Sequence, residues 1–282
     1  GKLAGYSQVE ELGNLETPIV LTNTLSLPKA SDALISYSLG LTGNENIRSV
    51  NPLVGETNDG YLNDIRARRI NEEDVHYAIK NAKSGPVTEG NVGAGTGTVC
   101  FGYKGGIGTA SRILPKESGA FTLGVLVQTN FGGVLEINGV PVAREMGEYP
   151  DAYKYQSDGS CMIVVATDAP LGPRNLKRLA KRAFMGLAKT GGIASNGSGD
   201  YVIAFSTNSN VRIPYNTDKI TIEGKFLKNE AMTPLFLAAI EATEEAILNS
   251  LFAAKTMSGH QGHKAEALPI EEVMTIMKKY NR

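Results

Sequence analysis

The sequence predicts a layered α+β sandwich. Strand-like and helix-like patterns both occur along the 282 residues, and the strand patterns between residues 120 and 224 are partly clustered instead of alternating strictly with helices. This order favours sheets covered by helices over a doubly wound parallel sheet. A chain of this length allows one large domain or two small ones, and we expect residues 1–282 to form a single domain.

Two helices are predicted in the first third of the chain. Residues 31–41 show a short helical spacing that ends at a Gly-Asn pair. Residues 71–82 begin with Asn71 as N-cap and three acidic residues, which favour a helix start, and this pattern ends before a Gly-Pro pair. Residues 55–69 lie between the two helices, are polar and have no clean period, so we assign them to a loop.

A glycine-rich stretch leads into two predicted strands. Residues 90–108 contain eight glycines interleaved with valine, cysteine and aromatic residues, which is typical of loops packed closely against strands. Residues 120–130 form a β-rich run that ends at Asn130. Residues 160–167 form a short, continuous apolar run, which predicts a strand buried on both faces.

The second half of the chain continues with helices and two more predicted strands. Residues 174–189 have the clearest amphipathic helical pattern, with a basic face opposite an apolar one. Residues 201–207 and 219–224 are predicted to be strands. A Thr-Pro pair opens a long helix over residues 233–254, and a short helix over residues 270–280 ends the chain.

Charge and hydropathy exclude several classes of partner. The 28 basic and 29 acidic residues give a net charge of −1, so the molecule lacks a field that would recruit nucleic acid or an anionic membrane. We interpret the basic face of residues 174–189 as a solvated surface or a subunit interface. No stretch approaches the ~20 apolar residues that span a bilayer. We therefore expect no nucleic-acid partner and no membrane partner.

No metal or cofactor is expected. His76, His260 and His263 do not form a ligand cluster, and Cys100 and Cys161 lack the spacing of a zinc site and are too few for a disulfide scaffold. The glycine cluster contains no GxxxxGK[ST] motif and matches the dinucleotide fingerprint only weakly. We expect Cys161 to belong to the core.

The start of the sequence gives a default location. The chain begins with a glycine and shows no charged n-region followed by an apolar h-region. The default expectation is therefore a cytoplasmic protein. A periplasmic protein is the alternative, because the N-terminus looks incomplete and a signal segment would lie upstream of the first residue.

The junction of Gly159 and Ser160 is the first candidate catalytic site. It joins a polar segment to a strand that is predicted to be buried. A serine at this place commonly does no more than begin the strand. In the alternative, Ser160 attacks the carbonyl of Gly159, exchanges the peptide for an ester, and after hydrolysis becomes an N-terminal residue. Its α-amine, with a pKa of about 8, can then accept the hydroxyl proton.

The segment SNGSGDYVIAFST contains a second cluster of polar residues. Asn196, Ser198 and Asp200 lie in a glycine-spaced turn just before a predicted strand. Such residues often bond only to their own backbone in a turn. In the functional interpretation, Ser198 forms a hydrogen bond to the nucleophile or its amine, and Asp200 orients that network.

Four longer motifs follow one another along the chain: GNVGAGTGTVCFGYKGGIGTASR, GVLVQTNFG, DGSCMIVVATDAPLGPRNLKRLAKRA and NGSGDYVIAFST. In this order they resemble the L-aminopeptidase/D-esterase and β-peptidyl aminopeptidase family, the DmpA-like serine aminopeptidases. Near the start, GNLETPIVLTNTLS and NDGYLNDI fit the same family, and GHKAEALP resembles its closing motif. The resemblance covers nearly the whole chain in register.

The resemblance implies a four-layer αββα sandwich akin to the N-terminal-nucleophile hydrolases, with a different strand connectivity. It further implies a self-processing aminopeptidase that releases N-terminal residues from short peptides, amides or esters, with L-α, D- or β-aminoacyl groups, through an acyl-enzyme. Cleavage between Gly159 and Ser160 would divide the chain into an α part, residues 1–159, and a β part, residues 160–282. The implied assembly is a homotetramer of such α/β heterodimers.

The resemblance also assigns roles to individual residues. Ser160 matches the family's nucleophile, and Asn130 matches the asparagine whose side-chain amide donates to the oxyanion. Ser198 and Asp200 match the serine and the acid that support the nucleophile. Many relatives have glutamate where Asp200 stands.

Two further positions concern the substrate. Tyr61 matches an aromatic position beside the scissile carbonyl, and Asp59 matches an acid expected to hold the substrate's ammonium group. Many relatives have glutamate at the Asp59 position as well. Two alternatives remain at this point. One is an acyltransferase of the ornithine acetyltransferase type, in which an amine replaces water as the acceptor, and the other is a non-catalytic relative.

Overall fold

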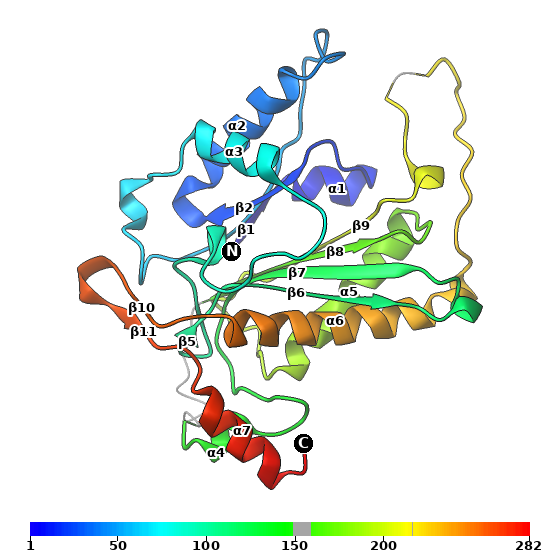
Figure 1. Cartoon of the computed structure of the whole chain (residues 1–282). Helices are drawn as coiled ribbons and strands as arrows, with labels where there is room; N and C mark the ends of the chain where they lie inside the picture. The colour runs from blue at the N-terminus through cyan, green and yellow to red at the C-terminus, as the bar shows by residue number, and fades with distance from the viewer. Residues whose placement is uncertain (149–158, 216) are drawn as a thin grey trace.

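The computed structural model describes residues 1–148, 159–215 and 217–282. Two β-sheets lie face to face, and helices cover the outer side of each sheet (Figure 1). From one side to the other, the layers are helices α2 and α3, a smaller sheet, a larger sheet, and helices α5 and α6. The α+β prediction and the four-layer αββα sandwich are thereby confirmed.

The larger sheet has the strand order β6-β7-β8-β9. Its strands are β6 (Ile107–Ile113), β7 (Thr122–Asn130), β8 (Ser160–Thr167) and β9 (Tyr201–Ser206). The pairs β6–β7 and β7–β8 are antiparallel. The pair β8–β9 is parallel, and a crossover helix joins its two strands. Since β7 and β8 run in opposite directions, Asn130 at the end of β7 pairs with Ser160 at the start of β8.

The smaller sheet has the strand order β1-β3-β2, and the sequence patterns did not predict it. It consists of β1 (Lys2–Ala4), β3 (Leu53–Thr57) and β2 (Ile19–Asn23). The central strand β3 is buried along its whole length, so its sequence LVGET shows no apolar–polar alternation. The assignment of residues 55–69 to a loop is therefore wrong for the first three of them.

Two short hairpins flank the sheets. They are formed by β4 (Val99–Cys100) with β5 (Tyr103–Lys104), and by β10 (Met257–Ser258) with β11 (Lys264–Ala265).

All five predicted helices are present among the described residues. The helices are α1 (Tyr6–Leu12), α2 (Leu27–Leu39), α3 (Glu72–Asn81), α4 (Val142–Glu145), α5 (Pro173–Lys189), α6 (Thr233–Phe252) and α7 (Ile270–Lys279). The α3 start has a full capping box between Asn71 and Asp74. Helix α2 begins before the predicted residue 31, because Pro28 suits a first helical turn. Within the described residues, no helix is both long and apolar enough to cross a membrane.

The main core lies between the larger sheet and helices α5 and α6. The apolar face of α5 buries Leu179, Ala183 and Leu187, as its amphipathic pattern predicts. Helix α6 approaches β6 so closely that a Cβ atom on Gly108 would lie 1.9 Å from the carbonyl oxygen of Ala246. Glycine at this second position of β6 is thus required by the close helix–sheet contact.

The two sheets contact each other through an apolar contact and through a group of hydrogen bonds. Gly55 of β3 lies against Met162 of β8, with 2.9 Å between the Met162 sulfur and the place where a Cβ would be. The buried Gln128 of β7 donates from Nε2 to the Thr57 hydroxyl at 2.8 Å and to the Thr22 carbonyl at 3.0 Å. These contacts place the carboxyl end of β3 above the ends of β7 and β8 that carry Asn130 and Ser160.

The predicted strand over residues 219–224 is wrong. The chain leaves β9 and returns to α6 through an extended arm, residues 207–228, which stands away from the body (Figure 1). No neighbouring strand pairs with residues 219–224 among the described residues. The alternating pattern KITIE therefore faces solvent, and Ile220 is fully exposed. Residue 216 lies outside the described part of the arm.

Candidate active site

Ser160 and Gly159 form the centre of the site. Ser160 is 2% exposed, and its hydroxyl donates to the carbonyl oxygen of Gly159 at 2.5 Å. The same carbonyl oxygen accepts the backbone N–H of Gly199 at 3.0 Å. The predicted cleavage site thus lies between a hydroxyl group and a main-chain donor. A donor in this position polarises a carbonyl and stabilises negative charge that develops on its oxygen.

The residue before Ser160 has no room for a side chain. A Cβ atom on Gly159 would lie 2.6 Å from the carbonyl oxygen of Asn130 and 2.6 Å from the Cα of Phe131. Glycine is therefore needed for the backbone to approach β7 this closely.

Gly199 was not predicted as a functional residue. It lies in the turn between Ser198 and Asp200, and its contribution is a backbone N–H, which no side-chain motif reveals. The available signal was the spacing of glycines in NGSGD, which is typical of a turn whose main chain comes close to another group.

The side chain of Asn130 is held in one orientation. Its Oδ1 accepts the backbone N–H of Val99 at 3.0 Å, and its Nδ2 donates to the carbonyl oxygen of Asn58 at 3.0 Å. Since only an oxygen can accept from Val99, these two bonds fix which end of the amide carries the hydrogens. One hydrogen of the Nδ2 group is directed at Asn58, and the second has no acceptor among the described residues, so it can serve an oxyanion.

Ser198 and Asp200 interact directly. The Ser198 hydroxyl donates to Oδ1 of Asp200 at 3.0 Å. Burial raises the pKa of Asp200 above its ordinary value, although hydrogen bonds from Ser198 and from the backbone N–H of Cys161 act in the opposite direction. Cys161 follows Ser160 in β8, so the carboxylate lies beside the start of that strand. The structure thus brings Asp200 together with Ser198, whereas it shows no hydrogen bond from Ser198 to Ser160 among the described residues, and the catalytic roles of Ser198 and Asp200 stay predictions.

Asp59 lies in the loop after β3 and is 8% exposed. Burial raises the pKa of this carboxyl, and hydrogen bonds from Asn63 and Asn23 partly oppose the shift. The Asn63 amide donates to both carboxylate oxygens, at 3.1 and 3.2 Å. Both oxygens of Asp59 are thus already engaged by neighbouring side chains.

Glu56 is a second buried carboxylate, which the sequence analysis missed. It is fully buried in β3, and one of its oxygens accepts the hydroxyl of Thr24. The other oxygen, Oε1, lies 3.8 Å from Nζ of Lys2 and has no hydrogen-bond donor among the residues that the structure describes. An acidic residue inside a strand that is buried throughout is rare without a functional reason, but the sequence patterns did not show that this strand exists.

Tyr61 contacts the β10–β11 hairpin. Its half-exposed ring stacks on His263, with 4.5 Å between ring centroids and 4° between the planes. A ring nitrogen of His263 also lies 2.7 Å from the carbonyl oxygen of Tyr61. The hairpin thereby covers the loop that carries Asn58 and Asp59. The predicted role of Tyr61 beside the scissile carbonyl remains a prediction.

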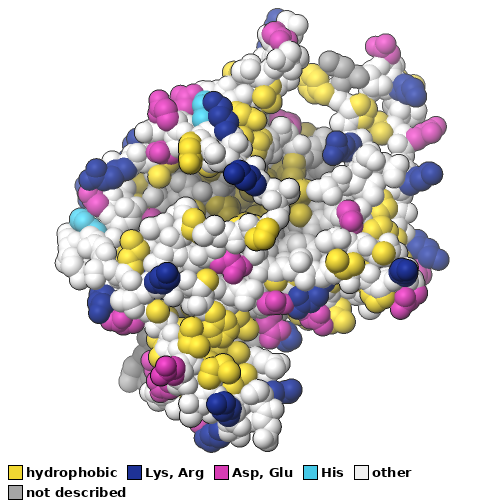
Figure 2. Space-filling view, viewed as in Figure 1, with side chains coloured by type: hydrophobic (Ala, Val, Ile, Leu, Met, Phe, Trp, Pro, Cys, Tyr) yellow, Lys and Arg dark blue, Asp and Glu magenta, His cyan; other side chains and the backbone are white. Residues whose placement is uncertain are grey.

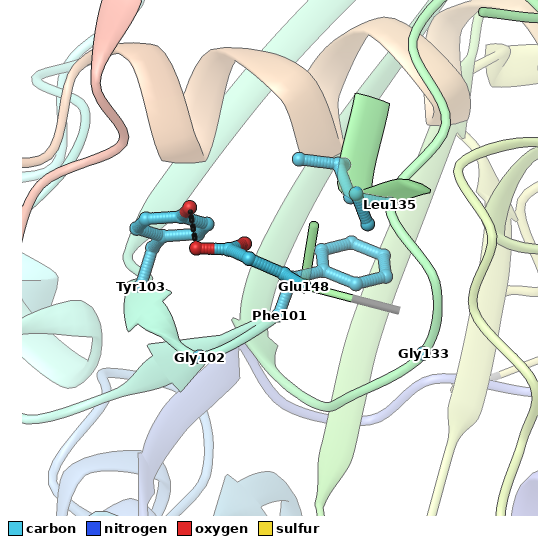
Figure 3. Close-up of a pocket in the computed structure, with 7 residues that line it drawn as sticks. Phe101, Gly102, Tyr103, Gly133, Leu135 and Glu148 are labelled. Carbon is cyan, nitrogen blue, oxygen red and sulfur yellow. Dashed lines mark hydrogen bonds between the residues drawn. The ribbon is translucent and has the colours of Figure 1, made fainter. Parts of the chain in front are cut away.

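A pocket of about 270 Å³ lies next to the site (Figure 3). Its lining residues are Phe101, Gly102, Tyr103, Gly133, Leu135, Ala143 and Glu148. The Tyr103 hydroxyl donates to Glu148 at 2.6 Å. The ring of Phe101 packs edge-on against Phe131, at 5.0 Å between centroids, and Phe131 in turn contacts Gly159. Phe131 therefore lies between Phe101, which lines the pocket, and Gly159 at the predicted cleavage site.

Metal-binding and thiol chemistry have little basis in the described residues. Within this part of the chain, no three His, Cys, Asp or Glu side chains are grouped so that they could hold a metal ion. Cys100 and Cys161 are free and fully buried, and burial raises the pKa of Cys100 to about 12. The prediction that Cys161 belongs to the core is confirmed. The nucleophilic group that the structure places beside a carbonyl is the hydroxyl of Ser160.

Comparison with known proteins supports the resemblance noted in the sequence. The model of peptidase family S58 matches residues 1–265. The β-peptidyl aminopeptidase BapA of Sphingosinicella microcystinivorans is 43% identical over 298 residues, which cover 100% of this chain and 74% of that protein.

Solved structures agree in both fold and sequence. A protein from Pyrococcus horikoshii OT3 superposes with a TM-score of 0.91 and 48% identity, covering 100% of this chain and 78% of the other. The L-aminopeptidase D-Ala-esterase/amidase of Ochrobactrum anthropi, described as a prototype for the serine aminopeptidases and a variant of the Ntn hydrolase fold, gives a TM-score of 0.90. It is 36% identical, over 100% of this chain and 78% of the other. The chain belongs to peptidase family S58 and is a serine aminopeptidase of the N-terminal-nucleophile type.

Proposed function

We propose that Ser160 acts twice, first in cleavage of its own chain and then in turnover. In the first reaction, Oγ attacks the carbonyl carbon of Gly159, the bond to the Ser160 nitrogen breaks, and an ester forms. Water then hydrolyses the ester and leaves a carboxylate on Gly159 and a free α-amine on Ser160. The observation that carries this proposal is the Gly159 carbonyl held between the Ser160 hydroxyl and the Gly199 N–H. The products are an α part, residues 1–159, and a β part, residues 160–282.

The same groups serve the aminopeptidase reaction. The freed α-amine of Ser160 accepts the proton of its own hydroxyl, which attacks the substrate's carbonyl carbon. Negative charge on the substrate's oxygen is stabilised by the Gly199 N–H and by the second amide hydrogen of Asn130. The amine then leaves with a proton, and water hydrolyses the acyl-enzyme. Ser198 and Asp200 orient the nucleophile and its amine.

The substrates are short peptides, amides and esters with a free amino terminus. The names of the relatives, a β-peptidyl aminopeptidase and an L-aminopeptidase D-Ala-esterase/amidase, support L-α, D- and β-aminoacyl groups as the classes to test. A panel of aminoacyl p-nitroanilides of these three classes should show release of nitroaniline.

A competing amine, added to the reaction, distinguishes an aminopeptidase from the acyltransferase alternative. In an aminopeptidase, hydrolysis should remain the main fate of the acyl group. A dominant transfer product would instead favour the acyltransferase.

Glu56 and Asp59 together form the negative region that we assign to the substrate's ammonium group. Oε1 of Glu56 lies 3.8 Å from Nζ of Lys2 and has no hydrogen-bond donor among the described residues, whereas both oxygens of Asp59 already accept hydrogen bonds. We therefore expect Glu56→Gln to lower kcat/KM by roughly 10- to 100-fold, since charge-assisted hydrogen bonds are worth about 1.5–3 kcal/mol. Asp59→Asn should cost less. Initial rates on an aminoacyl p-nitroanilide measure both, and a larger loss for Asp59→Asn would assign the ammonium to Asp59 instead.

Asp200 gives the reaction an acidic limit. Burial raises its pKa above 3.8, so kcat should fall as the pH drops through that raised value, because the protonated carboxyl has lost the charge that strengthens its bond from Ser198. The Asp200→Asn variant should be slower, and its kcat should not show this fall at low pH.

The raised pKa of Asp200 also makes stability depend on pH. The folded state binds this proton more tightly than the unfolded state, so the free energy of unfolding should decrease as pH rises from 3.8 through the raised pKa. Urea unfolding of both proteins at several pH values measures this slope, which Asp200→Asn should reduce.

The arm formed by residues 207–228 supports the proposed homotetramer of α/β heterodimers. It carries several exposed large apolar side chains, namely Ile213, Tyr215, Ile220, Ile222 and Phe226. Such a concentration on one segment is typical of a protein–protein contact. Light scattering should give about 120 kDa, four times the chain mass of 30.0 kDa, and the double variant Ile220→Asp, Ile222→Asp should lower it. A monomeric wild-type protein would contradict this assembly.

A further inference from the structure

Lys104 of β5 is a buried cation without a function in the reaction described above. It is fully buried, and its Nζ donates to two neutral groups, the carbonyl oxygens of Gly95 at 2.8 Å and Gly105 at 2.6 Å. Lysine is almost never buried so completely unless it is paired with an opposite charge. Burial accordingly lowers its pKa from 10.5 to about 8, although Cys100 of the paired strand β4 and Asp59 of the loop after β3 act in the other direction.

The two carbonyl groups belong to the two ends of one loop, residues 95–105, which includes the β4–β5 hairpin. Between Gly95 and Gly105, the chain closes on itself through a backbone bond of 3.0 Å from the Gly105 N–H to the Thr98 carbonyl. The Thr98 hydroxyl also donates to the Gly95 carbonyl, at 3.1 Å. Lys104 therefore joins both ends of the loop through a single nitrogen atom.

This loop carries the group that fixes Asn130. Val99 follows Thr98, and its N–H is the donor that holds Oδ1 of Asn130 at 3.0 Å. A shift of the loop would move the Val99 N–H and allow the amide of Asn130 to rotate. The hydrogens of that amide would then no longer point where the oxyanion forms.

We propose that Lys104 is a positioning residue, whose ammonium group holds the loop from Gly95 to Gly105 closed and thereby keeps the Asn130 amide aimed at the oxyanion. This inference rests on the proposed function of Asn130. A lysine suits the task because an ammonium group has three hydrogens and can bind two carbonyls at once, and because charge strengthens each bond in a dry interior. Methionine has a similar length but lacks any donor, so it fills the same space without closing the loop.

The test is a double-mutant cycle in the full chain. Lys104→Met alone should lower kcat roughly 10- to 100-fold with little change in KM, since misplacement of a catalytic group by about 1 Å costs rates of this order. In an Asn130→Ala background, the same substitution should lower kcat by less than about 3-fold, because the group that it positions is gone. Lys189→Met, at an exposed lysine of α5 that pairs with Glu244, is the matched control and should leave kcat unchanged.

Measuring kcat over a pH series distinguishes the positioning role of Lys104 from a purely structural one, because a purely structural role would not make the effect of Lys104→Met depend on pH. As the pH rises through about 8, Lys104 loses its proton. The ratio of wild-type kcat to Lys104→Met kcat should therefore fall above pH 8, because the wild-type loop loses the charge that strengthens its bonds.

Thermal unfolding reports whether Lys104→Met folds. Thr98→Ala, which removes the other side-chain donor to Gly95, is a milder second variant. It should lower kcat several-fold, again only when Asn130 is present.

The outcomes separate the inference from the proposed function. If Asn130→Ala lowers kcat but the effects of Lys104→Met and Asn130→Ala multiply independently, Lys104 does not act through Asn130 and the inference is wrong. If Asn130→Ala leaves kcat unchanged, the assigned role of Asn130 fails, and the inference fails with it. A ratio that does not change with pH, or a Thr98→Ala effect that persists without Asn130, also overturns the inference.

Discussion

Replacing Ser160 with alanine should leave the protein as one chain of 30.0 kDa and abolish its aminopeptidase activity. The substitution removes the oxygen that attacks Gly159 in self-cleavage and the substrate's carbonyl in turnover. Loss of the nucleophile in serine peptidases lowers kcat on the order of 10⁶-fold. We expect a loss of this size on an aminoacyl p-nitroanilide, and denaturing mass spectrometry should show the uncut chain.

Two controls accompany this variant. Ser111→Ala removes an exposed hydroxyl from β6 of the same sheet and should change neither cleavage nor turnover. Ser160→Cys keeps a nucleophilic atom at the same place and should retain measurable self-cleavage. Residual turnover by Ser160→Ala within 100-fold of the wild type would show that another residue attacks the substrate.

Replacing Asn130 with alanine should slow both self-cleavage and turnover by about 10²–10³-fold, the usual cost of losing one oxyanion donor. The loss should appear in kcat with little change in KM, because the bond forms to a charge that develops only in the transition state. Asn130→Asp is the sharper comparison. It keeps an acceptor for the Val99 N–H but removes the donor, so it should be at least as slow.

Rates of self-cleavage from timed mass spectra and rates of turnover from nitroaniline release test this prediction together. If both rates stay within about 3-fold of the wild type, the Gly199 N–H alone supports the oxyanion and Asn130 has only a structural role. If turnover falls while self-cleavage does not, the two reactions use different donors.

Strands β7, β8 and β9 of the larger sheet and helix α5 could be predicted because their patterns are long and regular, whereas the sequence patterns did not predict β6. The run from Ser160 to Thr167 is continuous and apolar, and residues 173–189 combine an apolar stripe with a basic face. The motifs that resemble the family run through these elements, with Asn130 at the end of β7 and Ser160 at the start of β8. Antiparallel pairing then places Asn130 opposite Ser160, so the two residues meet as the motifs imply.

The rest of the site depends on features without a periodic signal. Strand β3 is five residues long and buried throughout, so Glu56 could not be recognised as a buried carboxylate from sequence alone. Gly199 contributes only a backbone N–H, and Lys104 is defined by its burial among carbonyl groups. By contrast, residues 219–224 have the composition of a strand and form none, because strand formation needs a partner as well as a pattern.

The most direct test of the account is the mass of the wild-type protein under denaturing conditions after incubation, with sequencing of any new amino terminus. Cleavage between Gly159 and Ser160 should replace the 30.0 kDa chain with fragments of about 17 and 13 kDa, and the smaller one should begin with Ser160. A chain that remains whole while it turns over an aminoacyl substrate would contradict the account, because its Ser160 would have no free α-amine to act as base.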